Sequence, residues 1–316
     1  MDKTNKALAR IKAQPQLLLL VAMVAVCMLA VPRFGTSRNM LNILKTIATT
    51  SIIGCGMAVV LIGGNLDLSV GSVFSLLCVV SMRMQNTSVL LGIVVPFAFA
   101  MGVGVINGFL IYKFKINSII VTLGTMSIFS GVALLYSNSS AIAARPGTSF
   151  DLISGTSFLG IPSYVYIFFL VALLLEVLIK RTSFGRSLYL QGTNRQAAEI
   201  AGINVSAVTI LSMVICSCCV AVAAIIQCSR VGSAYPISGV GMEFNALAGV
   251  LLGGVSLSGG KGNVLKTIVG ALLLQTIVNS MILLDITHEW QDIVKSLLII
   301  IAIIFTEKTR LDNEND

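Results

Sequence analysis

The residues that could bind a nucleotide are Gly259, Gly260 and Lys261, which follow an apolar run. A phosphate-binding loop needs a further glycine at a fixed distance before its lysine and a Ser or Thr directly after it. Here Val255 occupies the first of these positions and Gly262 the second. The spacing therefore excludes a phosphate-binding loop, and any ATP that this protein depends on is expected to bind to another chain.

The acids, the histidine and the cysteines form no catalytic or metal-binding pattern. The single histidine, His288, is interpreted as part of a solvated loop with Asp285, Glu289, Trp290 and Asp292. The seven cysteines lie in or beside apolar runs without metal-ligand spacing, which is typical of packing residues; they are Cys27, Cys55, Cys78, Cys216, Cys218, Cys219 and Cys228. An intramembrane enzyme would need a paired acid and base or a metal site, so this class is disfavoured.

Asp67 is the most informative acid, because it lies in a glycine-rich turn between two apolar runs. An ionised carboxylate at mid-bilayer costs about 2.5–3.5 kcal/mol on insertion scales. In the turn, the carboxylate could instead accept backbone N–H bonds or meet water at the cytoplasmic mouth. Two roles stay open for Asp67: a cap for a helix that begins at Leu68, or a gate that couples to transport.

The elements that must position these residues are long apolar runs. Of the 316 residues, 56% are hydrophobic and only 11% are charged, whereas soluble domains carry about 25% charged residues. Runs without strand-like alternation predict an all-α integral membrane protein, a polytopic bundle of about ten helices. The runs are 17–31, 47–63, 68–82, 88–111, 118–137, 161–179, 206–228, 244–258, 264–284 and 293–305. Several are shorter than the ~20 residues of a straight span, so eight to ten crossings are expected.

The basic residues lie between the runs, so their first role is orientation in the bilayer and not nucleic-acid binding. With ten spans and a cytoplasmic N-terminus, 14 lysines and arginines fall in the cytoplasm and 6 outside, while Lys295 lies near the last span. This bias predicts that both termini are cytoplasmic. The N-terminal run is expected to be a retained helix instead of a signal peptide, because no clear cleavage site follows it.

Two glycine-rich stretches have similar sequences, Val60–Gly71 and Val250–Gly260. Each reads Val-Leu-aliphatic-Gly-Gly, followed by Leu-Ser and a nearby glycine. Glycine permits unwound backbone, which is tolerated at membrane depth where it lines a cavity. An internal repeat and two unrelated turns both remain open. The predicted gate or turn residues are Gly63, Gly64, Asp67, Gly71, Gly253, Gly254, Gly259 and Gly260.

The segment 180–205 is a polar, basic stretch that carries helix signals. Thr193 and Gln196 have the spacing of a capping box, and Gly202 stands where a glycine ends a helix. These signals predict a short cytoplasmic helix over 194–201, with Ala198 on a small face that fits another protein's groove. The alternative is an ordinary loop. The predicted contact residues are Thr193, Asn194, Gln196, Ala197, Ala198, Glu199 and Gly202.

Neutral polar residues are scattered along the apolar runs, among them Asn107, Thr122 and Asn279. A path lined by amides and hydroxyls suits an uncharged polyhydroxy solute better than an ion. The alternative is that these groups only form hydrogen bonds between helices.

Three motifs resemble a known family: GGNLDLSVGS at 63–72, TSFGRSLYLQGTNRQAAEIAGINV at 182–205 and LAGVLLGGVSLSGGKG at 247–262. Together they resemble the permease subunits of ribose-type ABC sugar importers, and the resemblance covers nearly the whole chain. Asn65 is a departure, because relatives usually carry glycine and then isoleucine before the Asp. This departure keeps the motif and leaves open an altered turn.

The resemblance implies one transmembrane permease domain over 1–316 in the bacterial cytoplasmic (inner) membrane, with tails at 1–16 and 307–316. The implied partners are a cytoplasmic ABC ATPase subunit, an extracytoplasmic sugar-binding protein and a second permease copy or sibling. No cofactor is implied in this chain, because ATP and Mg belong to the ATPase. In this family the segment matching 193–203 is the coupling helix. Relatives serve ribose, xylose, other monosaccharides and the autoinducer-2 signal.

Four external arginines are predicted to include docking contacts for carboxylates of the binding protein: Arg33, Arg38, Arg145 and Arg230. The rival function is an ion-coupled secondary transporter. That class needs titratable groups deep in the bundle, and this chain offers mainly Asp67 and Glu243, both near the ends of apolar runs.

Overall fold

The computed structural model describes residues 15–145, 147 and 149–315. The structure is 77% helical with little sheet, which confirms the all-α fold class. Most of the predicted N-terminal tail, with Lys3, Lys6, Arg10 and Lys12, lies outside the described residues, and so does Asp316.

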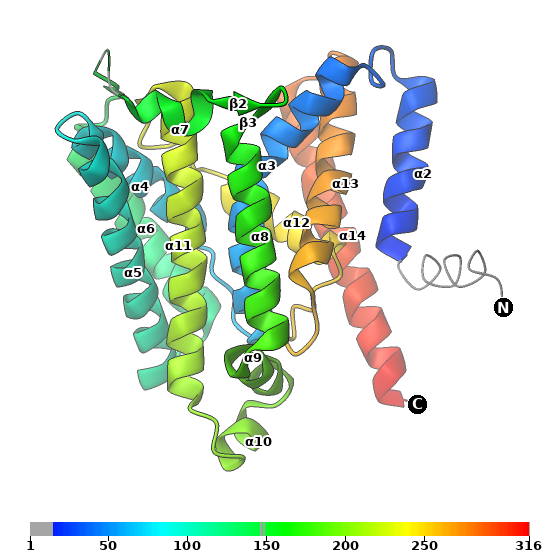
Figure 1. Cartoon of the computed structure of the whole chain (residues 1–316). Helices are drawn as coiled ribbons and strands as arrows, with labels where there is room; N and C mark the ends of the chain where they lie inside the picture. The colour runs from blue at the N-terminus through cyan, green and yellow to red at the C-terminus, as the bar shows by residue number, and fades with distance from the viewer. Residues whose placement is uncertain (1–14, 146, 148, 316) are drawn as a thin grey trace.

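The described helices form a bundle joined by short connections (Figure 1). The helices are α2 (Pro15–Ala30), α3 (Ser37–Ile62), α4 (Val70–Gln85), α5 (Val89–Lys113), α6 (Ser118–Ser137), α7 (Leu152–Gly155), α8 (Ser163–Arg181), α9 (Ser183–Thr193), α10 (Arg195–Ile200), α11 (Val205–Val231), α12 (Met242–Leu252), α13 (Val264–Leu283) and α14 (His288–Asn315). A 3-10 helix, η1 (Ser149–Asp151), and four two-residue strands complete it: β1 (Ile142–Ala143), β2 (Ser157–Phe158), β3 (Ile161–Pro162) and β4 (Ser233–Ala234).

Six helices in the described part are long and apolar enough to cross a membrane: α3, α5, α6, α8, α11 and α13. The four remaining predicted runs overlap α2, α4, α12 and α14. Of these, α4 has 16 residues and α12 has 11, so both fall short of the ~20 residues of a straight span. The chain is therefore a multi-pass helical membrane protein, and the number of about ten crossings stays a prediction.

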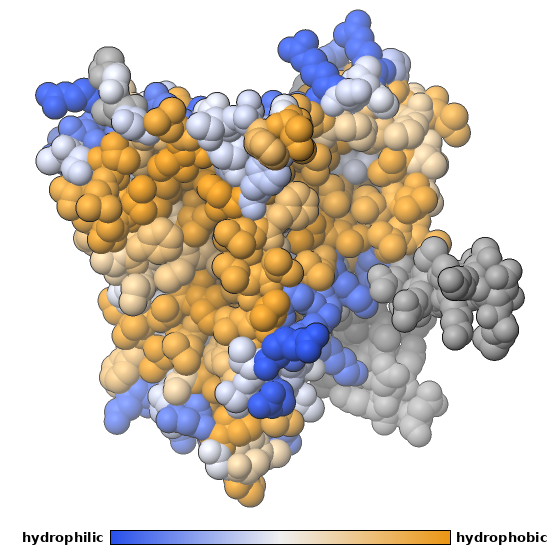
Figure 2. Space-filling model, viewed as in Figure 1, coloured by the Kyte–Doolittle hydropathy of each residue, from blue (hydrophilic) through white to orange (hydrophobic). Residues whose placement is uncertain are grey.

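Helices α3 and α11 form the centre of the bundle. Their most apolar windows are 78% and 67% buried, whereas that of α6 is only 22% buried. The exposed faces of the outer helices are apolar, and Figure 2 shows them as a broad hydrophobic band with polar residues above and below. A soluble protein would not expose such a band, so it is the surface that meets lipid.

Glycines bring the helices into close contact. A methyl group at Gly104 would lie 2.5 Å from the Cα atom of Val214, and one at Gly108 would lie 2.6 Å from that of Ile210. Helices α5 and α11 therefore approach through backbone surfaces that a larger residue would separate. Gly253 has the same role between α12 and α13, where an added methyl group would lie 2.7 Å from the Cα of Thr267.

The two ends of the bundle differ in structure. The upper end in Figure 1 carries the loops 31–36 and 138–162, with β1 paired antiparallel to β4 and β2 to β3. The lower end carries α9, α10 and the turns 63–69 and 253–263. The described parts of the loop 138–162 and the polar segment 180–205 thus lie at opposite ends of the molecule.

Candidate functional site

Helix α10 confirms the short helix predicted in the polar segment. It ends through Gly202, whose φ is +80°, with the N–H of Gly202 donating to Glu199 at 3.0 Å and that of Ile203 to Ala198 at 3.0 Å. The predicted capping box at Thr193 is wrong. Asn194 is the N-cap and accepts from the N–H of Ala197 at 3.0 Å. The Thr193 hydroxyl instead donates to Tyr189 at 2.9 Å, because Thr193 still belongs to α9.

The exposed face of α10 differs from the predicted one. Ala198 is only 3% exposed, so its side chain faces this chain and is not available to a groove on another protein. Ile200 is 89% exposed, and Ala197 and Ala201 are exposed beside it. Figure 2 shows the corresponding apolar patch at the lowest point of the molecule, where α10 lies in Figure 1. The exposed apolar residue of α10 is therefore Ile200 and not Ala198.

The two glycine-rich stretches form the same turn. Helix α3 ends with hydrogen bonds from Gly64 N to Leu61 O at 2.9 Å and from Asn65 N to Val60 O at 3.1 Å. Helix α12 ends with the equivalent bonds, Gly254 N to Leu251 O at 2.8 Å and Val255 N to Val250 O at 3.2 Å.

This pair of bonds is the Schellman motif, and it needs a left-handed residue at the second glycine. Gly64 has φ +78° and Gly254 has φ +81°. Asn65 is compatible with this geometry, because its N–H makes the same bond in the first turn that the N–H of Val255 makes in the second.

Tertiary packing brings the two turns together, although about 190 residues separate them in the sequence. The N–H of Gly260 donates to the carbonyl oxygen of Ile62 at 2.9 Å. A methyl group at Gly259, whose φ is +82°, would lie 2.7 Å from the Cα of Gly64. Gly71 was also predicted as a gate or turn residue, but it lies in neither of the two turns. It lies in the first turn of α4 and packs against Gly239 and Glu243.

A cavity of about 540 Å³ connects α10 to the first glycine turn. It is lined by residues of the turn, of the end of α5, of the α5–α6 connection and of α10: Gly64, Asn65, Ile111, Lys115, Ile116, Asn117, Ser118, Arg195, Gln196 and Glu199. Arg195 lies over the ring of Tyr112, with its Cζ atom 5.5 Å from the ring centroid. Gln196 and Glu199, predicted as contacts to a partner, thus also face this cavity.

Asp67 forms hydrogen bonds just before the start of α4. Its carboxylate accepts from the N–H of Ser69 at 2.9 Å and from the Ser69 hydroxyl at 2.6 Å. The Asn107 amide of α5 donates to the same hydroxyl at 3.1 Å. Asp67 is 1% exposed, so it does not meet water at the mouth. Helix α4 begins at Val70 and not at Leu68, and its N-cap is Ser69. Asp67 bonds to that cap residue, which favours a structural role at the start of the helix, and the gating role stays a prediction.

We expect Asp67→Asn to express normally and to retain transport within about twofold, because the amide oxygen can still accept from the Ser69 backbone. Asp67→Leu leaves that buried donor unpaired and is expected to cost about 1–3 kcal/mol of stability. Thermal unfolding of the purified proteins and uptake in cells measure both effects. A well-folded Asp67→Asn protein without transport would instead assign the carboxylate to a charge-dependent gate.

Two of the scattered polar residues, Asn279 and Thr122, form hydrogen bonds between or within helices. Asn39 and Asn279 exchange two amide hydrogen bonds of 2.9 and 3.0 Å between α3 and α13. Thr122 donates to Ser118 at 2.8 Å within α6. For these residues the contacts favour the interpretation as interhelical or local hydrogen bonds. Among the described residues, no group of three His, Cys, Asp or Glu could hold a metal ion.

Two buried carboxylates stand apart from the turns. Glu243 begins α12, is 3% exposed, and accepts from Gly241 at 3.2 Å. Glu176, which sequence reasoning missed, lies on α8 and forms an ion pair with Lys180 one turn later. Its spacing of four residues from Lys180 was the available signal.

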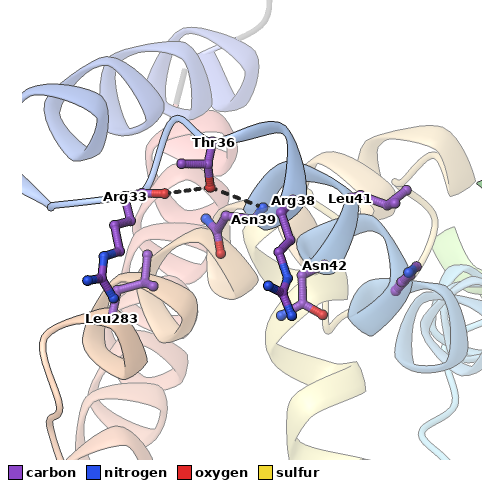
Figure 3. A pocket seen from close by; sticks show the side chains of 8 residues that line it. Arg33, Thr36, Arg38, Asn39, Leu41, Asn42 and Leu283 are labelled. Carbon is purple, nitrogen blue, oxygen red and sulfur yellow. Dashed lines mark hydrogen bonds between the residues drawn. The ribbon is translucent and has the colours of Figure 1, made fainter.

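The upper end has a cavity of about 450 Å³ lined by the predicted docking residues Arg33 and Arg38, together with Lys45. Figure 3 shows the two arginine side chains extending in the same direction from the start of α3 and the preceding loop. Among the described residues, no acid pairs with these three cations. Arg230 lies next to them and donates to the backbone of Lys45 at 3.5 Å. Arg145 lies elsewhere, beside Asn86.

Comparison with known proteins also indicates a membrane transport protein. The family described as "Branched-chain amino acid transport system / permease component" matches residues 39–303. The ribose import permease protein RbsC of Haemophilus influenzae is 34% identical over 92% of this chain and 92% of its own. The RbsC protein of Bacillus subtilis is 36% identical over 88% and 87%, and the L-arabinose transport system permease protein AraH of Escherichia coli is 34% identical over 96% and 93%.

No solved structure matches this chain. The family match covers most of the described helices, both glycine turns and α10. This chain therefore belongs to the family of transport-system permease components that includes the ribose and L-arabinose permeases.

Proposed function

We propose that this chain is the membrane-spanning permease subunit of an ABC importer that moves a monosaccharide inward, with ATP and Mg bound by a separate ATPase subunit. The similar proteins named for ribose, L-arabinose and D-allose support this substrate class. A ribose-like pentose is the proposed cargo, and the alternative within the same class is a sugar-like signal such as autoinducer-2. We further propose that the protein lies in the bacterial cytoplasmic membrane with both termini in the cytoplasm.

The observation that carries the proposal is the exposed apolar tip of α10, next to two glycine turns that touch each other. Ile200 projects from a helix that is held at both ends by caps. A small, fixed apolar projection is what a groove on a partner recognises. The ATPase is the proposed partner at this end. A binding protein at the upper end and a second permease copy or sibling complete the proposed assembly.

The test is uptake in cells that produce the tagged permease with its ATPase and binding protein. Labelled ribose, L-arabinose and D-allose are supplied separately, and a hydrolysis-deficient ATPase is compared with the active one. We expect the ATPase to co-purify with the permease and uptake of one sugar to stop with the deficient ATPase. Uptake that instead persists without hydrolysis and stops when the proton gradient is collapsed would identify a secondary transporter.

The cationic cavity at the upper end is proposed to receive carboxylates of the binding protein. Charges at the rim of an interface mainly change the association rate and its salt dependence. We expect Arg38→Glu to slow docking about tenfold at low salt and much less at high salt. Arg145→Glu, the same change at a predicted docking arginine away from the cavity, shows whether the docking surface extends beyond the cavity. Equal rates for wild type and Arg38→Glu at low salt would remove Arg38 from the docking surface.

A further inference from the structure

Helix α9 joins α10 to the rest of the bundle. It ends at Thr193, α10 begins at Arg195, and only Asn194 lies between them. In Figure 1, α9 lies between α10 and the lower ends of the long helices. A displacement of α10 by a partner therefore reaches α9 through a single residue, whereas residues 201–204 connect α10 to α11.

Gln191 connects α9 to the first glycine turn. Its side-chain amide donates to the carbonyl oxygen of Gly63 at 3.0 Å and to the hydroxyl of Thr209 on α11 at 3.1 Å. The carbonyl of Gly63 belongs to the end of α3, where it has no partner within the helix. Gln191 is 4% exposed, so this bond is shielded from water. Leu188 packs beneath the same glycine, with its Cδ1 atom 2.8 Å from where a methyl group on Gly63 would lie.

Tyr189 connects α9 to the second turn. Its hydroxyl donates to the carbonyl oxygen of Gly262 at 2.8 Å. Burial raises the pKa of the Tyr189 phenol, and the Glu176 carboxylate acts in the same direction. The hydroxyl therefore keeps its proton and remains a donor.

Gly192 lies at the point where all three segments meet. A methyl group there would collide with the carbonyl oxygen of Ile62 and with the N–H of Gly260. These two atoms form the hydrogen bond that joins the turns. The backbone of α9 thus contacts the hydrogen bond that joins the two turns. Gln191 bonds to the first turn and Tyr189 bonds to the second.

We propose that Gln191 and Tyr189 are positioning residues that clamp both glycine turns to α9, so that a movement of α10 displaces the ends of α3 and α12 together. This inference rests on the proposed function, in which α10 receives the movement from an ATPase. A helix fixed to two turns by directional bonds moves them as one unit, whereas separate loops would respond independently. Loss of either bond leaves α10 able to bind its partner and unable to shift both turns.

The test uses near-isosteric variants with matched controls. Gln191→Glu removes the donor from α9 to Gly63, whose carbonyl oxygen then keeps only the Asn65 amide at 3.4 Å. Tyr189→Phe removes only the hydroxyl that reaches Gly262. The controls remove the same kind of bond at the upper end: Gln291 donates to the carbonyl of Ile286 at 2.9 Å and Tyr166 to that of Phe158 at 2.9 Å. Each protein is reconstituted with ATPase and binding protein, and sugar imported per ATP hydrolysed is measured beside ATPase recovery and thermal unfolding.

We expect Gln191→Glu and Tyr189→Phe to bind the ATPase normally and to import at least about fivefold less sugar per ATP, the lower end of ordinary coupling between sites. Gln291→Glu and Tyr166→Phe should keep the wild-type ratio. A merely structural defect would lower import and hydrolysis together and leave the ratio unchanged, which would overturn the clamp. Gln191→Asn, which keeps a shorter donor, should recover part of the ratio.

The same experiment separates this inference from the proposed function. If the wild-type permease recovers no ATPase, the proposed function fails before coupling is measured. If it recovers the ATPase and both clamp variants keep the wild-type ratio, the clamp fails while the proposed function stands.

Discussion

Replacing Ile200 by Asp is expected to abolish recovery of the ATPase with tagged permease and to stop sugar import. Ile200 is 89% exposed, so the change removes little packing within this chain. Truncation of a buried anchor at the centre of an interface typically costs about 2 kcal/mol or more of binding free energy, which is roughly thirtyfold in affinity. A carboxylate in an apolar groove adds a desolvation penalty to that loss.

The controls separate docking from folding. Ile200→Val keeps the shape and should retain most of the binding. Leu159→Asp places the same charge at a residue that is 84% exposed at the upper end and should leave ATPase recovery unchanged. If Ile200→Asp recovers as much ATPase as the wild type, α10 is a passive loop and the proposed docking role is wrong. By contrast, Ala198→Arg would disturb the packing of α10 on its own chain, because Ala198 is buried.

Replacing Gly259 by Ala is expected to remove transport and to destabilise the protein. The added methyl group would lie 2.7 Å from the Cα of Gly64 and 2.8 Å from the carbonyl oxygen of Gly192. Backbone atoms cannot turn aside as side chains do, so the two turns must separate. The left-handed φ of +82° adds about 1–2 kcal/mol for a residue with a Cβ.

Gly160→Ala is the matched control for the conformational penalty of a left-handed φ at a residue with a Cβ atom. Gly160 has φ +76° and no atom within 4 Å of the added methyl group. Thermal unfolding should therefore show the conformational penalty alone, and import should continue. Gly259→Ala should lose import even at temperatures where the protein remains folded. Normal import by a folded Gly259→Ala protein would show that the contact between the turns is dispensable.

The sequence by itself determined the features that depend on local chemistry. Long apolar runs predicted the helices, because a bilayer requires every backbone polar group to be bonded within its own segment. Thr193, Gln196 and Gly202 predicted α10, because caps and left-handed glycines act within one turn. The repeated Val-Leu-aliphatic-Gly-Gly pattern is a local signal of the same kind, and both copies form the same turn. The capping box was misplaced by one residue, since Thr193 and Asn194 are both good caps and the extent of α9 decided between them.

Only the tertiary structure decided which of these elements touch. The bond between Gly260 and Ile62, and the bonds from Gln191 to Gly63 and from Tyr189 to Gly262, depend on how the helices pack. No periodicity encodes contacts between segments this far apart. The exposed face of α10 was also undetermined, because Ala198 and Ile200, two residues apart, project to nearly opposite sides of the helix. Burial of Ala198 and exposure of Ile200 follow from the direction in which α9 and α11 hold it.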